Sequence, residues 1–337
     1  ESMKSSTTAS EEGKAKVEPE FHNYWILKPV GLSRGRGISL IKNLAEVVYS
    51  QSSVIQKYVE RPLLCLNHYK FDLRLFIVVT SFKPLEAFIY RDGFARVSTH
   101  QYSLNPNDTV NKFIHLTNSS IQKQNANGPT EDNPINDKED DPDAGGSKIA
   151  LLGSNGLWKR LEQYGKINTE QLWSSICLLV VKSLVAVDDK MIFQPNCFEL
   201  FGYDILLDET LRPWLLEVNA SPSLARENAL DKRIKNAMLK DLVNLLDVAP
   251  FDRAALSRII SRRLSQMSKN RNLMGRNDAE LEKDLKDILG DYIPRKYGEL
   301  PKNMGNFERL APETSHHQYV IKLKKKIVRT ADDNSAT

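Results

Sequence analysis

Two carboxylates and one amide fall on two short apolar segments that a polar turn separates. Asp204 lies in residues 201–207, whereas Glu217 and Asn219 lie in residues 214–219. A hairpin would bring Asp204 beside the other two, because side chains two positions apart share one face of a strand. Oxygen ligands of this kind suit Mg²⁺, which usually bridges to nucleotide phosphates. The pattern favours a magnesium site over solvated acids at a strand end, because unpaired carboxylates inside apolar strands are costly.

A glycine-rich basic loop within residues 24–41 could approach a phosphate. Gly35 and Gly37 free the backbone, Arg34 adds charge, and Lys28 ends the predicted strand before the loop. The loop has neither the P-loop pattern nor the third glycine of a dinucleotide-binding fingerprint. These residues alone leave two interpretations open, a phosphate-binding loop and a basic hairpin turn.

The elements that would hold these residues are strands in the first half of the chain. Residues 70–99 have a strong β pattern, in which Asp72 and Arg74 share a face. A salt bridge between them is the structural alternative to a phosphate- or carboxylate-binding arginine. A turn signal at 91–93 predicts that a strand over 84–90 ends there and that a new strand returns.

Helical periodicity dominates the second half, with helices expected within 155–191, 226–247, 253–271 and 277–290. In the segment 226–247, Lys232, Arg233 and Lys235 are expected to be exposed. The stretch before the first helical segment, 124–147, is polar and acidic and predicts a mobile loop.

Composition limits the class of protein. The chain has 337 residues, 41% of them hydrophobic, and a formal charge of +4, enough for a sizeable core in one or two domains. Cys65, Cys177 and Cys197 are isolated, which fits a reducing compartment and argues against structural zinc. Residues 172–187 are too short and too polar for a membrane span, and predict a buried helix. The sequence shows no signal peptide. Because the first residue is Glu1 and not Met, we expect a piece of a longer protein.

Several separated motifs, taken in order, resemble the tubulin tyrosine ligase-like family of ATP-grasp ligases. They are YWILKPVGLSRGRGI at 24–38, VIQKYV at 54–59, KFDLR at 70–74, HLTNSS at 115–120, YDIL at 203–206 and LLEVNASPSL at 215–224. The resemblance spans about 25–311. It implies an α+β ATP-grasp fold with antiparallel sheets and flanking helices, followed by C-terminal helices.

The resemblance implies ATP and Mg²⁺ as cofactors. Implied nucleotide contacts are Lys28, Arg34, Gly35, Gln56, Lys57, Tyr58, Val59, Lys70, Asp72, Thr117 and Asn118. Asp204, Glu217 and Asn219 would again be the metal ligands. In such a site ATP converts a carboxylate into an acyl phosphate, and an amine then displaces phosphate.

The same resemblance implies the catalytic and substrate residues. The catalytic residues would be Arg74, Arg96 and Glu217, and the substrate contacts would be Arg96, Ser119, Lys148 and Lys235. His115 is expected to be a hydrogen-bonded structural histidine rather than a catalyst.

Three segments, SRGRGI, YVERPLL and WLLEVNASPSL, are most similar to the tubulin polyglutamylases. The implied reaction adds free L-glutamate to glutamate side chains of tubulin C-terminal tails. The basic residues 257–271 would attract an acidic tail, although a solvated helix face is the ordinary alternative. Accessory subunits and a cytoplasmic, cytoskeletal location, including cilium or flagellum and basal body, follow from the family. We expect neither nucleic acid nor membrane as a partner.

Other functions stay open. A glycylase or a tyrosine ligase of the same family would use the same chemistry with another donor. A non-catalytic microtubule-binding relative would not need Asp204, Glu217 and Asn219. An ATP-grasp ligase acting on a small molecule is disfavoured by the HLTN and KFDLR segments.

The resemblance also divides the chain into regions. The expected regions are a disordered lead-in at 1–20, part of the central ATP-grasp lobe at 21–60, the C-terminal lobe at 61–247 with the mobile acidic loop 124–147, a basic helical extension at 248–311, and a basic disordered tail at 312–337. The family has more of the central lobe upstream of residue 25, so we expect that lobe to be incomplete here.

Overall fold

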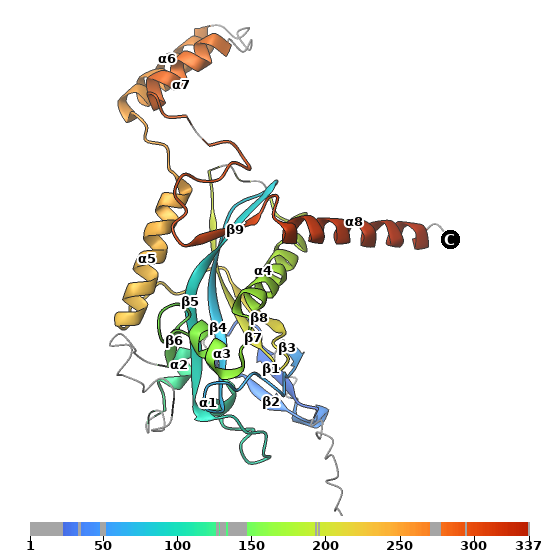
Figure 1. Ribbon diagram of the computed structural model, residues 1–337. Coiled ribbons are helices and arrows are strands. Elements are labelled where there is room, and N and C mark those ends of the chain that lie inside the picture. The colour runs from blue at the N-terminus through green and yellow to red at the C-terminus, as the bar shows by residue number, and fades with distance from the viewer. Residues whose placement is uncertain are drawn as a thin grey trace, which may run out of the picture. The chain divides into compact units, whose positions relative to one another are not determined.

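The computed structural model describes most of the chain in two compact units, 1–60 and 61–337 (Figure 1). The described residues are 23–32, 35–47, 52–125, 128, 133, 147–192, 194, 196–269, 278–293 and 295–335. The lead-in 1–20, Arg34 and most of 124–147 lie outside them. The boundary between the units coincides with the expected boundary after residue 60, and the naming of the units as ATP-grasp lobes stays a prediction.

The first unit contains a small antiparallel sheet. Its strands are β1 (Trp25–Pro29), β2 (Ser39–Ile41) and β3 (Ser53–Lys57), in the order β2-β1-β3, with a short 3-10 helix at Leu44–Glu46. The strand before the glycine-rich loop is therefore central, as β1 pairs with both neighbours. Gly35 and Gly37 adopt φ values of 73° and 70°, which residues with a Cβ rarely adopt.

The second unit is built on a larger antiparallel sheet. Its strands are β4 (Tyr69–Phe82), β5 (Leu85–Gln101), β6 (Lys148–Ala150), β7 (Glu199–Leu207), β8 (Pro213–Asn219) and β9 (Phe307–Ala311). Among the described residues they run in the order β6-β5-β4-β7-β8, and β9 pairs with a separate part of β5. The predicted hairpin at 201–219 is confirmed as β7 and β8, and the α+β class with antiparallel sheets is confirmed.

Alternation along β4 separates two hydrophobic clusters on the two faces of this sheet. Phe71, Leu73, Leu75 and Ile77 belong to one cluster, together with α3 (Leu157–Gly165) and α4 (Thr169–Val185). Phe76 and Val78 belong to the other, which α5 (Ala229–Leu246) covers with five leucine, isoleucine and methionine side chains. Each fully buried side chain of this size contributes roughly 1.5–3 kcal/mol. The two clusters therefore fix which face each strand residue occupies.

The turn predicted at 91–93 is wrong, because β5 continues through it. Leu75 opposes Gly93 whereas Ile77 opposes Ile89, so four steps of β5 match two steps of β4 and the pairing bulges. β6 pairs with β5 on one side of the bulge, and β9 pairs with it on the other. Pairing with distant strands, rather than the local turn signal, decides the structure of this segment.

Helices complete the second unit. They are α1 (Lys112–His115), α2 (Ser119–Gln122), the three already named, α6 (Arg253–Lys269), α7 (Asp278–Leu289) and α8 (Ser315–Ser335). Helices α3 to α7 confirm the helices that the periodicity of the sequence predicts. The disorder predicted for 312–337 is wrong for Ser315–Ser335, because Val320 of α8 joins the hydrophobic cluster that contains α4.

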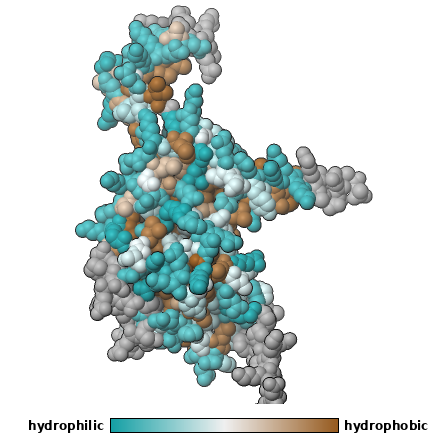
Figure 2. All heavy atoms as spheres, viewed as in Figure 1, coloured by the Kyte–Doolittle hydropathy of each residue, from teal (hydrophilic) through white to brown (hydrophobic). Residues whose placement is uncertain are grey.

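The apolar stretch 172–187 forms most of α4, whose inner side chains are buried in the core, as predicted. Among the described residues, no helix has the length and apolar character needed to cross a membrane. Figure 2 shows mostly hydrophilic side chains on the face in view, with smaller apolar areas between them. Cys65, Cys177 and Cys197 carry free thiols.

Candidate functional site

A row of charged side chains crosses the larger sheet on the face that α5 covers. Its members are Lys148 on β6, Arg96 on β5, Asp72 and Arg74 on β4, Asp204 on β7 and Glu217 on β8. Arg96 opposes both Lys148 and Asp72, and Asp204 opposes both Arg74 and Glu217. Directly opposed residues and residues two apart lie on the same face. The fold therefore brings together six charged residues that the sequence singled out.

Two arginines and two aspartates in this row form a continuous ion-pair network. Arg74 donates from Nε to Asp204 Oδ1 at 2.5 Å and from Nη2 to Oδ2 at 3.0 Å. Arg96 donates from Nε to Asp72 Oδ1 at 2.7 Å, and its Nη2 donates both to Asp72 Oδ2 and, at 2.8 Å, to Asp204 Oδ2. The salt bridge considered between Asp72 and Arg74 is replaced by these two cross-strand pairs.

Asp204 and Glu217 sit side by side with opposite electrostatic tendencies. Burial raises the pKa of Asp204, but Arg96 and Arg74 outweigh this effect and hold the pKa at about 2. Partial desolvation and the adjacent Asp204 carboxylate raise the pKa of Glu217 above its ordinary value. Asn219 donates from Nδ2 to Glu217 Oε1 and to the Gly202 carbonyl, each at 3.2 Å. Two neighbouring carboxylates at this position are therefore held at different proton affinities.

The donor set formed by Asp204, Glu217 and Asn219 fits Mg²⁺. All three can present oxygen atoms, and a cation would relieve the repulsion that raises the pKa of Glu217. Among the described residues there is no cluster of three or more His, Cys, Asp or Glu that could hold a metal. The predicted site therefore combines two carboxylates with an amide, and such a site suits an ion that retains several waters.

Lys148 and Lys235 meet at a carboxylate that the sequence analysis did not single out. Lys148 Nζ lies 2.9 Å and 3.1 Å from the two Asp231 oxygens, and Lys235 Nζ lies 3.3 Å from Oδ1. The expectation that Lys235 is exposed is wrong, because only 5% of the residue is accessible. Its side chain turns inward to Asp231, one helical turn earlier, and to the Ala225 carbonyl at 2.5 Å.

Lys70 and the short helices α1 and α2 lie beside the row. Lys70 is buried and donates from Nζ to the His115 carbonyl at 2.9 Å. Thr117 is buried, Asn118 is the residue before α2, and Ser119 begins that helix. These predicted nucleotide and substrate residues thus lie together in the second unit, and their roles stay predictions.

His115 has the surroundings of a structural histidine. It is buried, and its Nε2 lies 3.1 Å from the Asp108 carbonyl. Burial and the Lys70 ammonium lower its pKa to about 4. The ring is therefore neutral near pH 7, which matches the structural role expected for it.

The first unit gathers the other predicted nucleotide residues. Lys28 on β1 donates from Nζ to Gln56 Oε1 on β3 at 2.9 Å. Lys57 Nζ donates to Asn23 Oδ1 at 2.8 Å and lies 5.3 Å from the centre of the Trp25 ring.

Tyr58 and Val59 directly follow β3 at the end of the first unit. Tyr58 is buried, and its backbone N–H bonds to the Tyr24 carbonyl at 3.0 Å. Gly35 lies in the turn between β1 and β2, and Arg34 lies outside the described residues.

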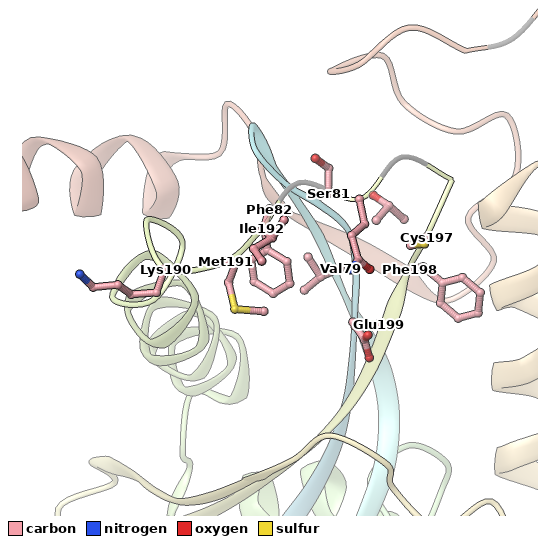
Figure 3. A pocket seen from close by; sticks show the side chains of 11 residues that line it. Val79, Ser81, Phe82, Lys190, Met191, Ile192, Cys197, Phe198 and Glu199 are labelled. Atoms are coloured by element: carbon pink, nitrogen blue, oxygen red, sulfur yellow. The ribbon is translucent and has the colours of Figure 1, made fainter.

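A cavity of about 350 Å³ lies elsewhere, near the opposite ends of β4 and β7 (Figure 3). Val79 and Glu199 line it and oppose each other, five residues along the strands from Arg74 and Asp204. Five residues of strand span roughly 17 Å. The cavity is therefore separate from the charged row, and none of the predicted site residues lines it.

Residues 2–256, about three quarters of the chain, match the Tubulin-tyrosine ligase family. The chain belongs to this family. The antiparallel sheets and flanking helices are consistent with the ATP-grasp-like fold that the resemblance implied.

Several members of the tubulin-tyrosine ligase family are similar to this chain. They include Tubulin polyglutamylase TTLL5 of Mus musculus, 37% identical over 230 residues, which are 66% of this chain and 16% of the relative; Tubulin monoglutamylase TTLL4 of Homo sapiens, 38% identical over 229 residues, 66% of this chain and 18% of the relative; and Tubulin polyglutamylase TTLL7 of Homo sapiens, 33% identical over 319 residues, 86% of this chain and 34% of the relative. The chain thus spans roughly a third or less of their lengths.

Sequence reasoning missed two residues in this member of the tubulin-tyrosine ligase family. Asp231 binds both lysines, and its spacing of four residues before Lys235 is a helical ion-pair signal that could have identified it. Gly202 lies within β7, where a Cβ would stand 2.8 Å from Pro222 Cβ and 3.4 Å from Arg74 Cδ. A glycine inside a strand indicates such a close approach.

Proposed function

We propose that this protein is an ATP-dependent ligase that adds glutamate to glutamate side chains of tubulin C-terminal tails. The observation that carries the proposal is the charged row, in which an Asp204–Glu217 carboxylate pair and a set of buried cations lie on one face of one sheet. Membership of the tubulin-tyrosine ligase family supports the ligase chemistry. The printed names of the relatives, tubulin polyglutamylases and monoglutamylases, support glutamate as donor.

The two ends of the row suit different parts of the reaction. Asp204, Glu217 and Asn219 would hold Mg²⁺, which when bound neutralises phosphate charge. Lys148 and Lys235 are cations suited to a carboxylate of the free amino acid. Arg96 lies between these ends, opposite Lys148 and in contact with Asp204, where positive charge can stabilise a phosphorylated carboxylate.

The reaction itself needs no covalent protein intermediate. A side-chain carboxylate of the tubulin tail takes the terminal phosphoryl group of ATP, and ADP leaves. The amine of free glutamate then attacks the acyl carbon, the bond to phosphate breaks, and an amide and inorganic phosphate result. Arg74 and Arg96 would stabilise the negative charge that develops on the phosphorylated group. In the first unit, Lys28 and the backbone around Gly35 would bind the nucleotide.

We also propose that α6 recruits the acidic tail, through only some of its arginines. Arg262 and Arg263 both bind Asp284 of α7, so these two guanidinium groups already have an acidic partner. Arg253 and Arg258 are exposed on the same helix. We propose that these exposed arginines attract the tail, with an attraction that weakens as salt rises. Cytoskeletal association follows from the tubulin substrate, with cilium, flagellum or basal body as further locations and accessory subunits as further partners.

The test is incorporation of labelled glutamate, glycine and tyrosine into microtubules with ATP and Mg²⁺, using the wild-type protein and Glu217→Gln. We expect glutamate incorporation that falls by about 100-fold or more in the variant, because the charged site loses a carboxylate. Incorporation of glycine or tyrosine instead would retain the mechanism and refute the donor. Microtubule binding without any incorporation would favour a non-catalytic relative.

A further inference from the structure

Asp231 is fixed from several directions at the start of α5. Its backbone N–H donates to the Asn228 side chain at 2.7 Å, in the cap of the helix. Its carboxylate is fully buried and accepts bonds from Lys148, which lies on β6. Lys235, on the same helix as Asp231, completes the group. One carboxylate thus connects a strand of the sheet to the helix that covers it.

Besides their contact with Asp231, both lysine side chains are confined by burial and by one aromatic ring. Their Nζ atoms lie 5.1 Å and 5.7 Å from the centre of the same Phe94 ring, and the residues are 8% and 5% exposed. Burial and the neighbouring Lys148 ammonium lower the pKa of Lys235, and Asp231 acts against this shift. The carboxylate therefore positions both ammonium groups and favours the charged form of Lys235.

The group carries an excess of positive charge. Two ammonium groups share one carboxylate, and the neighbouring acid, Glu227, is itself paired with Lys123. Among the described residues, the three lysines of this neighbourhood, Lys123, Lys148 and Lys235, therefore outnumber its two carboxylates, Asp231 and Glu227, by one. Burying an uncompensated charge is costly, so such a group is suited to a ligand that brings a negative charge.

The position of the excess charge indicates which ligand it would take. Lys148 opposes Arg96, so the group continues the charged row at its β6 end. The carboxylates of Asp204 and Glu217 lie toward the β8 end of the same row. A small anion bound by the lysines would therefore lie on the reacting face but away from the proposed metal ligands.

We propose that Asp231 is a positioning residue that holds Lys148 and Lys235 as one cationic pair for a carboxylate of the free amino acid. This inference rests on the proposed function, because it identifies what positions the amino-acid end of that site. Asp231 need not touch the ligand, since it acts through the lysines. A purely structural counter-ion would instead affect stability without a selective effect on amino-acid binding.

The test compares Asp231→Asn, Asp231→Glu and a matched control, Glu86→Gln. Glu86 is another buried carboxylate of the same unit, and it binds Arg295 through both oxygens at 2.7 Å, away from the lysines. The first measurement is KM for free glutamate and kcat, at saturating ATP and microtubules. The second is the thermal shift that free L-glutamate produces with Mg²⁺ and a non-hydrolysable ATP analogue.

We expect Asp231→Asn to raise the KM for glutamate by about tenfold or more, with a smaller change in kcat, because the lysines lose the anionic partner that positions them. Asp231→Glu should recover part of the loss. Glu86→Gln should lower the melting temperature yet leave the KM within about twofold of the wild-type value.

An unchanged or lowered KM in Asp231→Asn would overturn the inference. If Asp231→Asn does not fold, Asp231→Glu carries the test, since it keeps the charge but moves the carboxylate, and a wild-type KM would refute positioning. Absence of glutamate incorporation by the wild-type protein refutes the proposed function instead. In that case the thermal shift decides: a shift in the wild type that Asp231→Asn loses supports the inference, and any other result overturns it.

Discussion

Arg74 and Asp204 face each other across β4 and β7, and the guanidinium donates two hydrogen bonds to the carboxylate, at 2.5 Å and 3.0 Å. Asp204 is 2% exposed, so its carboxylate depends on protein partners rather than on water. Glu217, its neighbour on β8, is exposed. The two carboxylates proposed to bind Mg²⁺ therefore differ in how much they contribute to the stability of the fold.

Asp204→Asn should destabilise the protein, whereas Glu217→Gln should not. Removing the buried Asp204 charge leaves Arg74 without its anionic partner, and we expect a loss of about 3 kcal/mol in the free energy of unfolding. Glu217→Gln removes a carboxylate whose pKa is raised by desolvation and by the neighbouring Asp204, so its charge does not stabilise the fold. Denaturant unfolding in the presence of a chelator measures both. Equal losses in the two variants would contradict the asymmetry, although both variants should lose ligase activity.

Gly202→Ala should disturb the same network through sterics alone. An added Cβ would lie 2.8 Å from Pro222 Cβ and 3.4 Å from Arg74 Cδ, so the strand or the arginine must move. We expect a loss of about 1–3 kcal/mol in stability and reduced glutamate incorporation. The control is Gly165→Ala at the end of α3, where the nearest atom would be 3.8 Å away. A stable, fully active Gly202→Ala protein would contradict the packing argument.

The proximity of Asp204, Glu217 and Asn219 could be predicted from sequence because it is local. Alternation on two strands and one short turn suffice to place the three side chains together. The continuation of β5 through 91–93 could not be predicted, because it depends on pairing with β6 and β9. Turn signals describe only the local chain.

The same limit explains the errors at Lys235 and at the C-terminal helix. Lys235 lies in a charged stretch that is typical of an exposed helix face. It is buried because the fold places Lys148, 87 residues earlier, and Asp231 beside it. Similarly, Lys324 of α8 donates from Nζ to Asp188 Oδ1 at 2.5 Å and to the Val185 carbonyl at 3.0 Å. A basic run looks disordered until its long-range partners are known.

Glu86 should give part of the stability its own pH dependence. Burial raises the pKa of this carboxyl, but bonds from Arg295 and Thr80 outweigh burial and lower it below 4.5. Because the folded pKa is lower than the unfolded one, the contribution is present above about pH 4.5 and is lost as pH falls through the folded value.

Glu86→Gln should therefore be less stable than wild type at pH 7, and the difference should shrink below about pH 4.5. Melting temperatures between pH 3 and pH 7 measure this, as a range chosen around the carboxyl pKa. Glu170→Gln, which removes an exposed partner of Arg91, serves as control and should change little. A difference that stays constant down to the lowest pH would show that the Glu86 charge is not responsible.

Lys28→Met should weaken ATP binding more than Lys57→Met. The Lys28 ammonium is held by Gln56 beside the glycine-rich turn, where we place the nucleotide phosphates. The Lys57 side chain instead contacts Asn23 and Trp25, away from that turn. We expect an increase in Kd of roughly tenfold for Lys28→Met, measured with a fluorescent ATP analogue. Equal effects in both variants would contradict the assignment of Lys28 to the phosphates.

Val320→Ala tests whether α8 is docked as the structure shows. Val320 is 5% exposed in the cluster that contains α4, whereas Ile327 on the same helix is 60% exposed. Truncating the buried side chain should cost roughly 1–2 kcal/mol and make α8 more accessible to protease, because a cavity is left where the helix docks. Ile327→Ala, the matched control, should change stability by less than about 0.5 kcal/mol. If both variants behave like wild type, the segment does not contribute to the core, and the disorder predicted from its sequence describes it better than the helix.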